Sequence, residues 1–223
     1  MIIKTDELSA IEKKDVFSLK IMCETESFPD TTVLYKSDLG GYIADTKGGC
    51  IISGEFNGAE LSSFINFLSP KTIFSNPQNA EEIKGYKNRK TVTVFEKCDI
   101  KETKFSGDEL KSDEIYDILK KAKGFSLPPF EQFAVNFCRQ KNKNNLFYTA
   151  FRERAVAIAS VSGEWAYLNA VASLKAGCGS AVLGGMLSKL KGKKVFAVCE
   201  EKIKPFYIKN GFTECDKAII LEQ

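Results

Sequence analysis

The segment of residues 165–199 constrains the fold of this chain more than any other part. Tyr167, Asn169 and Val171 alternate with apolar neighbours near its start, which predicts a half-buried strand. Gly177 and Gly179 follow, and apolar residues then recur at helical spacing as far as position 190. Residues 195–199 form a second, short apolar run. The segment therefore predicts a strand, a glycine loop, a helix and a second strand.

The glycine loop is a candidate anion site. Gly177 and Gly179 allow the backbone to approach a ligand closely and to adopt positive φ. Unpaired N–H groups at the start of the following helix favour negative charge, and the small residues Ser180 and Ala181 leave room for it. The loop therefore predicts a bound phosphate or pyrophosphate, although a Gly-x-Gly turn without any ligand is an equally open alternative.

Two nucleotide-binding patterns fit the loop poorly. A Walker A loop needs Lys-Ser/Thr after its last glycine, and the loop has no such pair. A Rossmann fingerprint is half matched by Gly177, Gly179, Val182 and Glu200. A doubly wound domain that began at this loop would need several further strands, and only about one fits after Glu200. Dinucleotide binding is therefore kept as the second alternative to a GNAT-type site or an unliganded turn.

A third pattern matches more residues. The segment resembles the acetyl-CoA-binding motif of the GNAT superfamily of N-acyltransferases, in which a Val precedes Arg/Gln-x-x-Gly-x-Gly/Ala at the start of a helix. Val171, Gly179 and Ala181 stand at the Val and glycine positions, and Ala176 stands where the family has Arg or Gln. Two further departures are Ser173, where Pro is frequent, and Glu200, where Asn is usual.

A second block supports the same resemblance. Residues 205–212 look like the family's later motif, a helix that carries Tyr207 four residues before Gly211-Phe212. The predicted order from residue 108 is helix, helix, three strands, helix, strand, helix, strand, which is the GNAT order. The resemblance covers about residues 108–223 and implies an α/β fold with a mixed sheet.

The chain is expected to contain two domains. Residues 1–99 form an N-terminal α/β domain, whose strand and helix rhythm could make it a degenerate GNAT-like copy or an unrelated cap. Its first 26 residues predict a helix. The polar segment 100–107 is the boundary, and residues 108–223 form the GNAT-like domain.

The resemblance implies acetyl-CoA as the cosubstrate. The strand backbone around residues 168–171 would pair with the pantetheine amides, and the loop would hold the phosphates. Lys175 could replace some of the charge lost at Ala176. The implied coenzyme-binding residues are Asn169, Ala170, Val171, Lys175, Ala176, Gly177, Cys178, Gly179, Ser180, Ala181 and Tyr207.

Catalysis in such a protein is direct attack of an amine on the thioester. The chain contains no histidine, so proton transfer must use other side chains or water. Tyr207 stands at the position of the family's general acid. Glu164 and Tyr167 are candidates for the base because they lie in or near the central predicted strand. Each of the three could instead serve packing or surface roles.

Composition excludes several function classes. Net charge is +3, with 32 basic and 29 acidic residues, so no nucleic-acid partner is expected. No apolar run approaches the roughly 20 residues that span a bilayer, and no signal profile is present, so no membrane partner is expected. Seven scattered cysteines favour reduced thiols in a cytoplasm, and no metal site is expected.

The sequence therefore predicts an acetyl-CoA-dependent N-acetyltransferase acting on a small-molecule or peptide amine. A catalytically silent acyl-CoA-binding or regulatory module is the first alternative, because of the departures at Ala176, Ser173 and Glu200. A dinucleotide-binding oxidoreductase is the second. A monomer and a homodimer are equally open.

Overall fold

The computed structural model describes residues 1–12, 14–100, 102, 104–122 and 124–223. The chain divides into two compact units that are not contiguous in sequence. Unit 1 comprises Met1–Phe95, Val198–Lys204 and Glu214–Gln223, and unit 2 comprises Glu96–Ala197 and Pro205–Thr213. The expected boundary segment 100–107 falls within unit 2, and its residues 101 and 103 lie outside the described part. The final strand, expected in the second domain, belongs to unit 1 instead.

Unit 1 does not begin with the expected helix. Residues Ile2–Lys4 form strand β1, and helix α1 starts only at Val16. The Asp15 carboxylate accepts a hydrogen bond from the Ser18 N–H at 2.7 Å, and this cap sets the helix start. The prediction of one helix over 1–26 was therefore wrong at its start, where a strand and a short 3-10 helix over Leu8–Ala10 precede α1; residue 13 lies outside the described part. The elements of this part of the chain are β1 (Ile2–Lys4), α1 (Val16–Ser27), β2 (Val33–Ser37), β3 (Tyr42–Thr46), β4 (Gly49–Ser53), α2 (Gly58–Leu68), β5 (Thr72–Ser75), α3 (Pro77–Glu82) and β6 (Asn88–Lys97).

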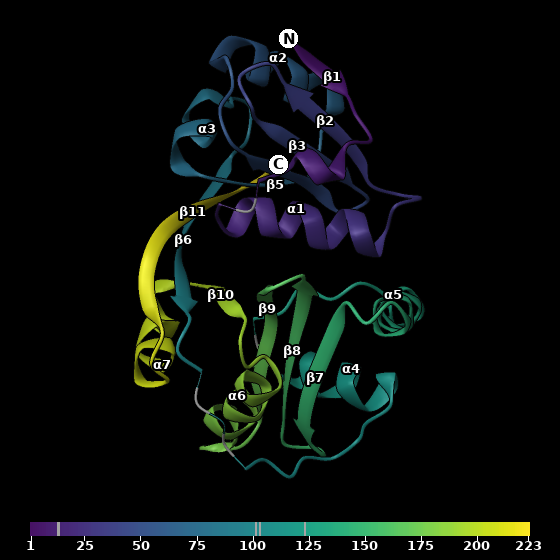
Figure 1. Cartoon of the computed structure of the whole chain (residues 1–223), viewed down its shortest axis with the longest axis vertical. Coiled ribbons are helices and arrows are strands. Elements are labelled where there is room, and N and C mark those ends of the chain that lie inside the picture. The colour runs from purple at the N-terminus through teal and green to yellow at the C-terminus, as the bar shows by residue number, and fades with distance from the viewer. Residues whose placement is uncertain (13, 101, 103, 123) are drawn as a thin grey trace. The chain divides into compact units, whose positions relative to one another are not determined.

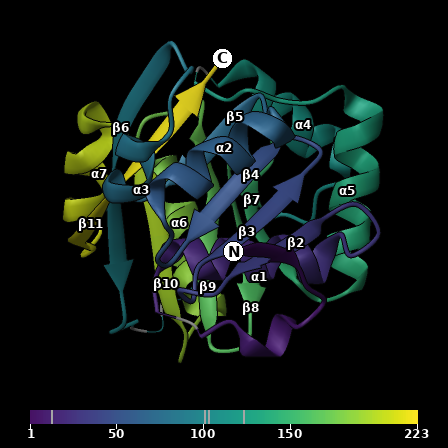
Figure 2. The ribbon, with the colours of Figure 1, turned by 90° about the horizontal axis from the view of Figure 1, so that it is seen from above.

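The sheet of unit 1 includes the last strand of the chain. Strands β2, β3 and β4 are antiparallel, and β5 runs parallel to β4. Strand β11 (Thr213–Glu222) pairs antiparallel with β5, with Ile219 opposite Ser75, and lies between β5 and β6 (Figure 2). Ile219 and Leu221 are buried in the same core cluster as Ile73. The C-terminus thus supplies an interior strand of the N-terminal unit.

Unit 2 contains the elements that the sequence predicted around the glycine loop. Strands β7, β8 and β9 form an antiparallel meander, and β10 runs parallel to β9. The predicted strand, loop, helix, strand segment is confirmed to within a few residues. The elements are α4 (Ser112–Lys121), α5 (Phe130–Asn142), β7 (Leu146–Phe151), β8 (Ala155–Ser162), β9 (Trp165–Ser173), α6 (Cys178–Lys189), β10 (Lys194–Cys199) and α7 (Lys204–Lys209).

Helices cover both faces of this meander (Figure 1). On one face, Val156 and Ile158 of β8 pack in a core cluster with Ile115 and Ile118 of α4. On the other face, the buried Thr149 hydroxyl donates a 2.7 Å hydrogen bond to the carbonyl of Val182 in α6. Every residue of β8 is buried, as expected for a strand covered on both sides.

The two units share an order of elements. In the part of the chain up to β6, and again from α4 to the C-terminus, one or two helices precede three antiparallel strands, a helix, a strand parallel to the third, a short helix and a final strand. The second of these final strands, β11, belongs to unit 1. In unit 2 the antiparallel meander argues against the doubly wound parallel sheet of a dinucleotide-binding domain. Among the described residues, every helix is too short or too polar to cross a lipid bilayer.

Candidate functional site

The start of α6 has the properties of an anion site. Gly177 is its N-cap and has φ of +81°, and no side chain of the described residues caps the first N–H groups. The first turn carries no acidic residue. Because the first N–H groups of a helix lack partners within the helix and carry the positive end of its dipole, this end favours a negatively charged ligand.

The loop before α6 is compact. The Ser173 hydroxyl donates to the Lys175 carbonyl at 2.6 Å, and the Cys178 N–H donates to the same carbonyl at 3.3 Å. Lys175, Ala176 and Gly177 are all exposed. The sequence departure at Ser173 thus has a local role, because its hydroxyl closes the turn that carries Lys175.

Helix α7 is held against the start of α6. The Asn210 amide donates to the Ser180 hydroxyl at 3.3 Å. A Cβ added to Gly179 would lie 3.5 Å from the Phe206 ring and 3.4 Å from the Ser173 Cβ. A Cβ at Gly179 would therefore make only ordinary van der Waals contacts with α7 and β9, whereas Gly177 is required by its backbone conformation.

Two features open the backbone of β9 beside this helix start. Parallel pairing of β9 with β10 covers three residue pairs and ends at Tyr167 with Phe196, although β9 continues to Ser173. In the ladder with β8, a bulge lies where Ala159 pairs with Leu168 and Ile158 pairs with Ala170. Asn169 is the extra residue of the bulge, and its amide donates to the Ser160 hydroxyl at 2.7 Å. A bulge of this kind bends its strand and leaves ladder groups unpaired.

The structure brings Tyr207 to this region. Its side chain is buried, and its ring packs edge to face on Phe206 and Phe212, with centroid distances of 5.3 and 5.4 Å. Gly211, with φ of +76°, ends α7 and allows the Phe212 N–H to donate to the Tyr207 carbonyl at 3.1 Å. The Tyr-x-x-x-Gly-Phe spacing therefore builds a single aromatic cluster next to the start of α6.

The two candidate bases lie in different places. Tyr167 is half-buried at the point where the β9–β10 ladder ends, opposite Ser160 of β8. Because Ser160 alternates with Val156 and Ile158, Tyr167 projects from the sheet face that α4 covers. Glu164 is exposed in the β8–β9 turn, five positions and roughly 16 Å of strand before the bulge. The structure groups Tyr167 with the opened strands and leaves Glu164 apart.

The remaining predicted residues line the loop and the bulge. Ala170 and Val171 are half-buried in β9, directly after the bulge. Cys178 and Ser180 are half-buried in the first turn of α6, and Ala181 is exposed there. No shared cluster of three or more potential metal ligands occurs among the described residues.

Sequence reasoning missed three contributors to the site. Asn210 and Ser160 act through the hydrogen bonds given above, and Arg154 accepts a 2.7 Å hydrogen bond at its carbonyl from the Leu174 N–H. Their partners lie 30, 9 and 20 positions away in sequence. Only strand pairing and helix docking bring them together, so no local pattern could have indicated them.

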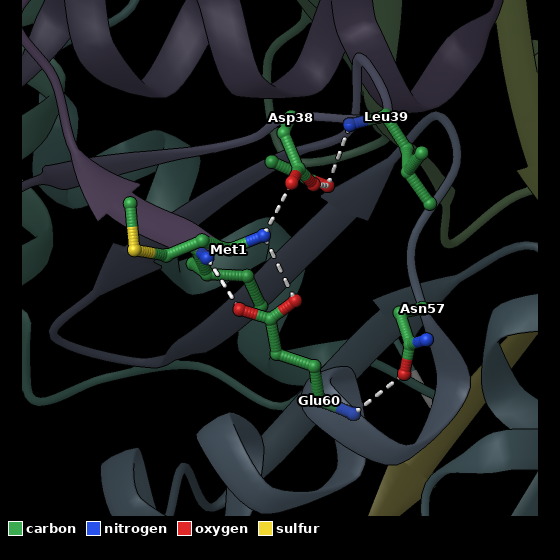
Figure 3. A network of polar contacts seen from close by, with 7 residues as sticks. Met1, Asp38, Leu39, Asn57 and Glu60 are labelled. Atoms are coloured by element: carbon green, nitrogen blue, oxygen red, sulfur yellow. Dashed lines mark hydrogen bonds and ion pairs between the residues drawn. The ribbon is translucent and has the colours of Figure 1, made fainter.

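The equivalent helix of unit 1 has a different start. Asn57 caps α2 by accepting from the Glu60 N–H at 3.1 Å, and Glu60 lies in the first turn. The Glu60 carboxylate is 3.2 Å from the Met1 ammonium and accepts from the Ile2 N–H at 2.6 Å (Figure 3). The Asp38 carboxylate contacts the same ammonium at 2.7 Å. This helix start is therefore occupied by side chains of the protein itself.

Comparisons with known proteins agree on the fold. No protein-family profile and no curated protein sequence matches the chain. A GNAT-family acetyltransferase structure from Colwellia psychrerythraea is 12% identical, with a TM-score of 0.58, over 100% of this chain and 99% of that one. A GCN5-related N-acetyltransferase from Sphaerobacter thermophilus is 11% identical, with a TM-score of 0.59, over 100% and 95%.

This similarity extends over both units, beyond the expected 108–223. The expected α/β fold with a mixed sheet is confirmed. The chain has the fold of the GNAT-family acetyltransferases.

Proposed function

We propose that this chain is an acyl-CoA-dependent N-acetyltransferase whose coenzyme site lies in unit 2. One observation carries the proposal: in a GNAT fold, the β9–β10 ladder ends at Tyr167, and β9 continues without β10 to Ser173, at the loop before a helix start that no side chain of the described residues caps. This combination offers unpaired strand backbone for amide groups and a positive helix end for phosphates. Acetyl-CoA contains both, in the order that the two features require.

The residues of the site fit this ligand. The N–H groups at the start of α6 would hold the pyrophosphate, and the β9 backbone around the bulge would pair with the pantetheine amides. The exposed Lys175 adds positive charge next to the loop. Ala176 contributes its backbone N–H but no cationic side chain, which distinguishes this loop from the family pattern.

Tyr207 is the proposed general acid. The amine nitrogen forms a bond to the thioester carbon, the carbon–sulfur bond breaks, and the phenol supplies the proton that the departing thiolate takes up. Phenols have a pKa of about 10 in water and thiols about 8.5, so a phenol is protonated at neutral pH and can donate to a thiolate. Tyr167, at the end of the paired ladder, stays the candidate for the base position: its hydroxyl oxygen would accept a hydrogen bond from the attacking amine, and the proton that the amine loses on attack would pass to water.

We also propose that unit 1 is a degenerate GNAT-like copy without a coenzyme site. The shared order of elements supports the common origin. The start of α2 supports the loss of binding, because Asn57 and Glu60 occupy it and Glu60 would repel a phosphate. The acceptor amine is a small molecule or a peptide.

A catalytically silent acyl-CoA-binding module is the second candidate function. The absence of a cationic side chain at Ala176 favours it, because weaker coenzyme binding is tolerable where no turnover is needed. Both candidates require acyl-CoA binding, and they differ in whether thiol is released.

Thermal unfolding with acetyl-CoA, CoA and NADH tests the binding step. A ligand at 100 times its Kd stabilises the folded protein by about 2.7 kcal/mol, so acetyl-CoA and CoA should raise the midpoint and NADH should not. No shift with acetyl-CoA would contradict both candidate functions.

Thiol release from acetyl-CoA with a panel of primary amines tests the chemical step. Loss of a positioned general acid lowers rates by roughly 10²–10⁴-fold, so Tyr207→Phe should lower kcat while leaving the acetyl-CoA-induced shift intact. Tyr116→Phe is the matched control, since the Tyr116 hydroxyl donates to the Pro128 carbonyl in the α4–α5 region. No turnover by the wild type, together with a clear acetyl-CoA shift, would favour the silent module.

A further inference from the structure

The turn between β7 and β8 lies against the loop before α6. Ala155, the first residue of β8, pairs with Ser173, the last residue of β9. One step further along both strands, the Leu174 N–H donates to the Arg154 carbonyl at 2.7 Å. Arg154 is therefore a direct neighbour of the loop that contains Lys175 and Ala176, although the sequence separates them by more than 20 positions.

The two arginines of this turn differ in their surroundings. The Arg152 guanidinium lies 3.2 Å from the Glu114 carboxylate and donates to the Glu109 carbonyl at 3.4 Å. Arg152 thus ties the turn to the segment around the start of α4. The Arg154 side chain is exposed, and within the described residues it has no ion pair or side-chain hydrogen bond. Its guanidinium is available to a ligand.

The loop has little positive charge of its own. Among residues 173–181, Lys175 is the only basic residue, and Ala176 occupies the position where the GNAT pattern has Arg or Gln. A CoA-type ligand carries a pyrophosphate and a 3′-phosphate. A guanidinium can bind phosphate through two parallel hydrogen bonds, which a single Lys ammonium cannot reproduce.

We propose that Arg154 binds a phosphate group of the CoA-type ligand and replaces the cationic side chain missing at Ala176. The proposal rests on the proposed function of unit 2. In this arrangement the cationic group lies on the β7–β8 turn and not on the loop. Strand pairing places that turn next to the backbone of the loop.

Binding measurements on three variants test this assignment. Dissociation constants for CoA and 3′-dephospho-CoA would be measured by calorimetry for the wild type, Arg154→Ala, Arg154→Lys and Arg152→Ala. Arg154→Ala removes one charged hydrogen-bonding group, so it should weaken CoA binding about tenfold to a hundredfold. Arg154→Lys should recover part of the lost affinity, because lysine keeps the positive charge but cannot make the two parallel hydrogen bonds of a guanidinium. Arg152→Ala removes the same charge from the same turn and should change CoA affinity less than about twofold.

The second ligand identifies the phosphate. If Arg154→Ala weakens CoA alone, its partner is the 3′-phosphate, and if it weakens both ligands equally, its partner is the pyrophosphate. Unchanged CoA affinity in Arg154→Ala would overturn the assignment, as would equal losses in the two alanine variants. Failure of the wild type to bind either ligand would overturn the proposed function itself. Unfolding midpoints without ligand identify any variant whose loss comes from misfolding.

Discussion

Gly177 shows how one residue can be required by conformation alone. Its φ is +81°, and a Cβ added there would meet no atom within 4 Å. Any cost of Gly177→Ala therefore comes from the left-handed backbone, for which a non-glycine residue pays roughly 1–2 kcal/mol. We expect Gly177→Ala to lower the free energy of unfolding by that amount, measured in urea through the fluorescence of Trp165. Gly179→Ala is the control, with a smaller expected loss because its added Cβ makes ordinary contacts. Equal stabilities of the two variants would contradict this account.

Glu200 makes unit 1 sensitive to acid. Hydrogen bonds from Lys90 and Lys202 lower the pKa of its carboxyl from 4.5 to about 2. The folded state therefore binds the proton less readily than the unfolded state, so the stabilisation is present above pH 4.5 and is lost as the pH falls towards 2. Because Glu200 is partly exposed, the effect should stay below about 1 kcal/mol.

The variant Glu200→Gln tests this pH dependence. It should be less stable than the wild type at pH 6 and equally stable near pH 2, by urea unfolding followed with circular dichroism. Glu81→Gln, at an exposed position of α3, should show no such convergence. A stability difference that stays constant from pH 6 to pH 2 would rule out the proposed ion pairs.

At the scale of elements, β11 is the strand on which unit 1 depends. It lies between β5 and β6, and Ile219 and Leu221 enter the core with Ile73. Deletion of 214–223 exposes this core and unpairs two strands, so we expect unit 1 to unfold, seen as loss of circular dichroism and of protease resistance. Trp165, the only tryptophan, lies in unit 2 and should keep a native emission spectrum. Full retention of helix and strand signal by the truncated chain would contradict the dependence.

At the scale of the whole molecule, the two units have separate cores and unequal helix starts. The cluster around Ile65 and Ile73 belongs to unit 1, and the cluster around Ile115 and Ile158 belongs to unit 2. The helix that follows the three antiparallel strands is α2 in unit 1 and α6 in unit 2. The Asn57 side chain caps the start of α2, whereas no side chain of the described residues caps the start of α6. Of the two equivalent helix starts that the structure describes, that of α6 is therefore the candidate coenzyme site.

The sequence by itself determined the elements around this site. The alternation in β9, the glycines before α6, the helical spacing after them and the Tyr-x-x-x-Gly-Phe block are local patterns, and local patterns follow from backbone geometry and burial. These patterns were enough to predict the fold of unit 2 and the position of Tyr207. They placed Glu164 near the site because its sequence distance from Tyr167 is short.

Only the tertiary structure decided the rest. The transfer of β11 to unit 1, the end of the β9–β10 ladder at Tyr167, the bulge at Asn169 and the approach of Arg154 to the loop all depend on which strands pair and in which register. Pairing energies come from partners distant in sequence, so a local pattern carries no record of them. The same register that exposes the β9 backbone also removes Glu164 from it, because a strand separates positions at its two ends by its full length.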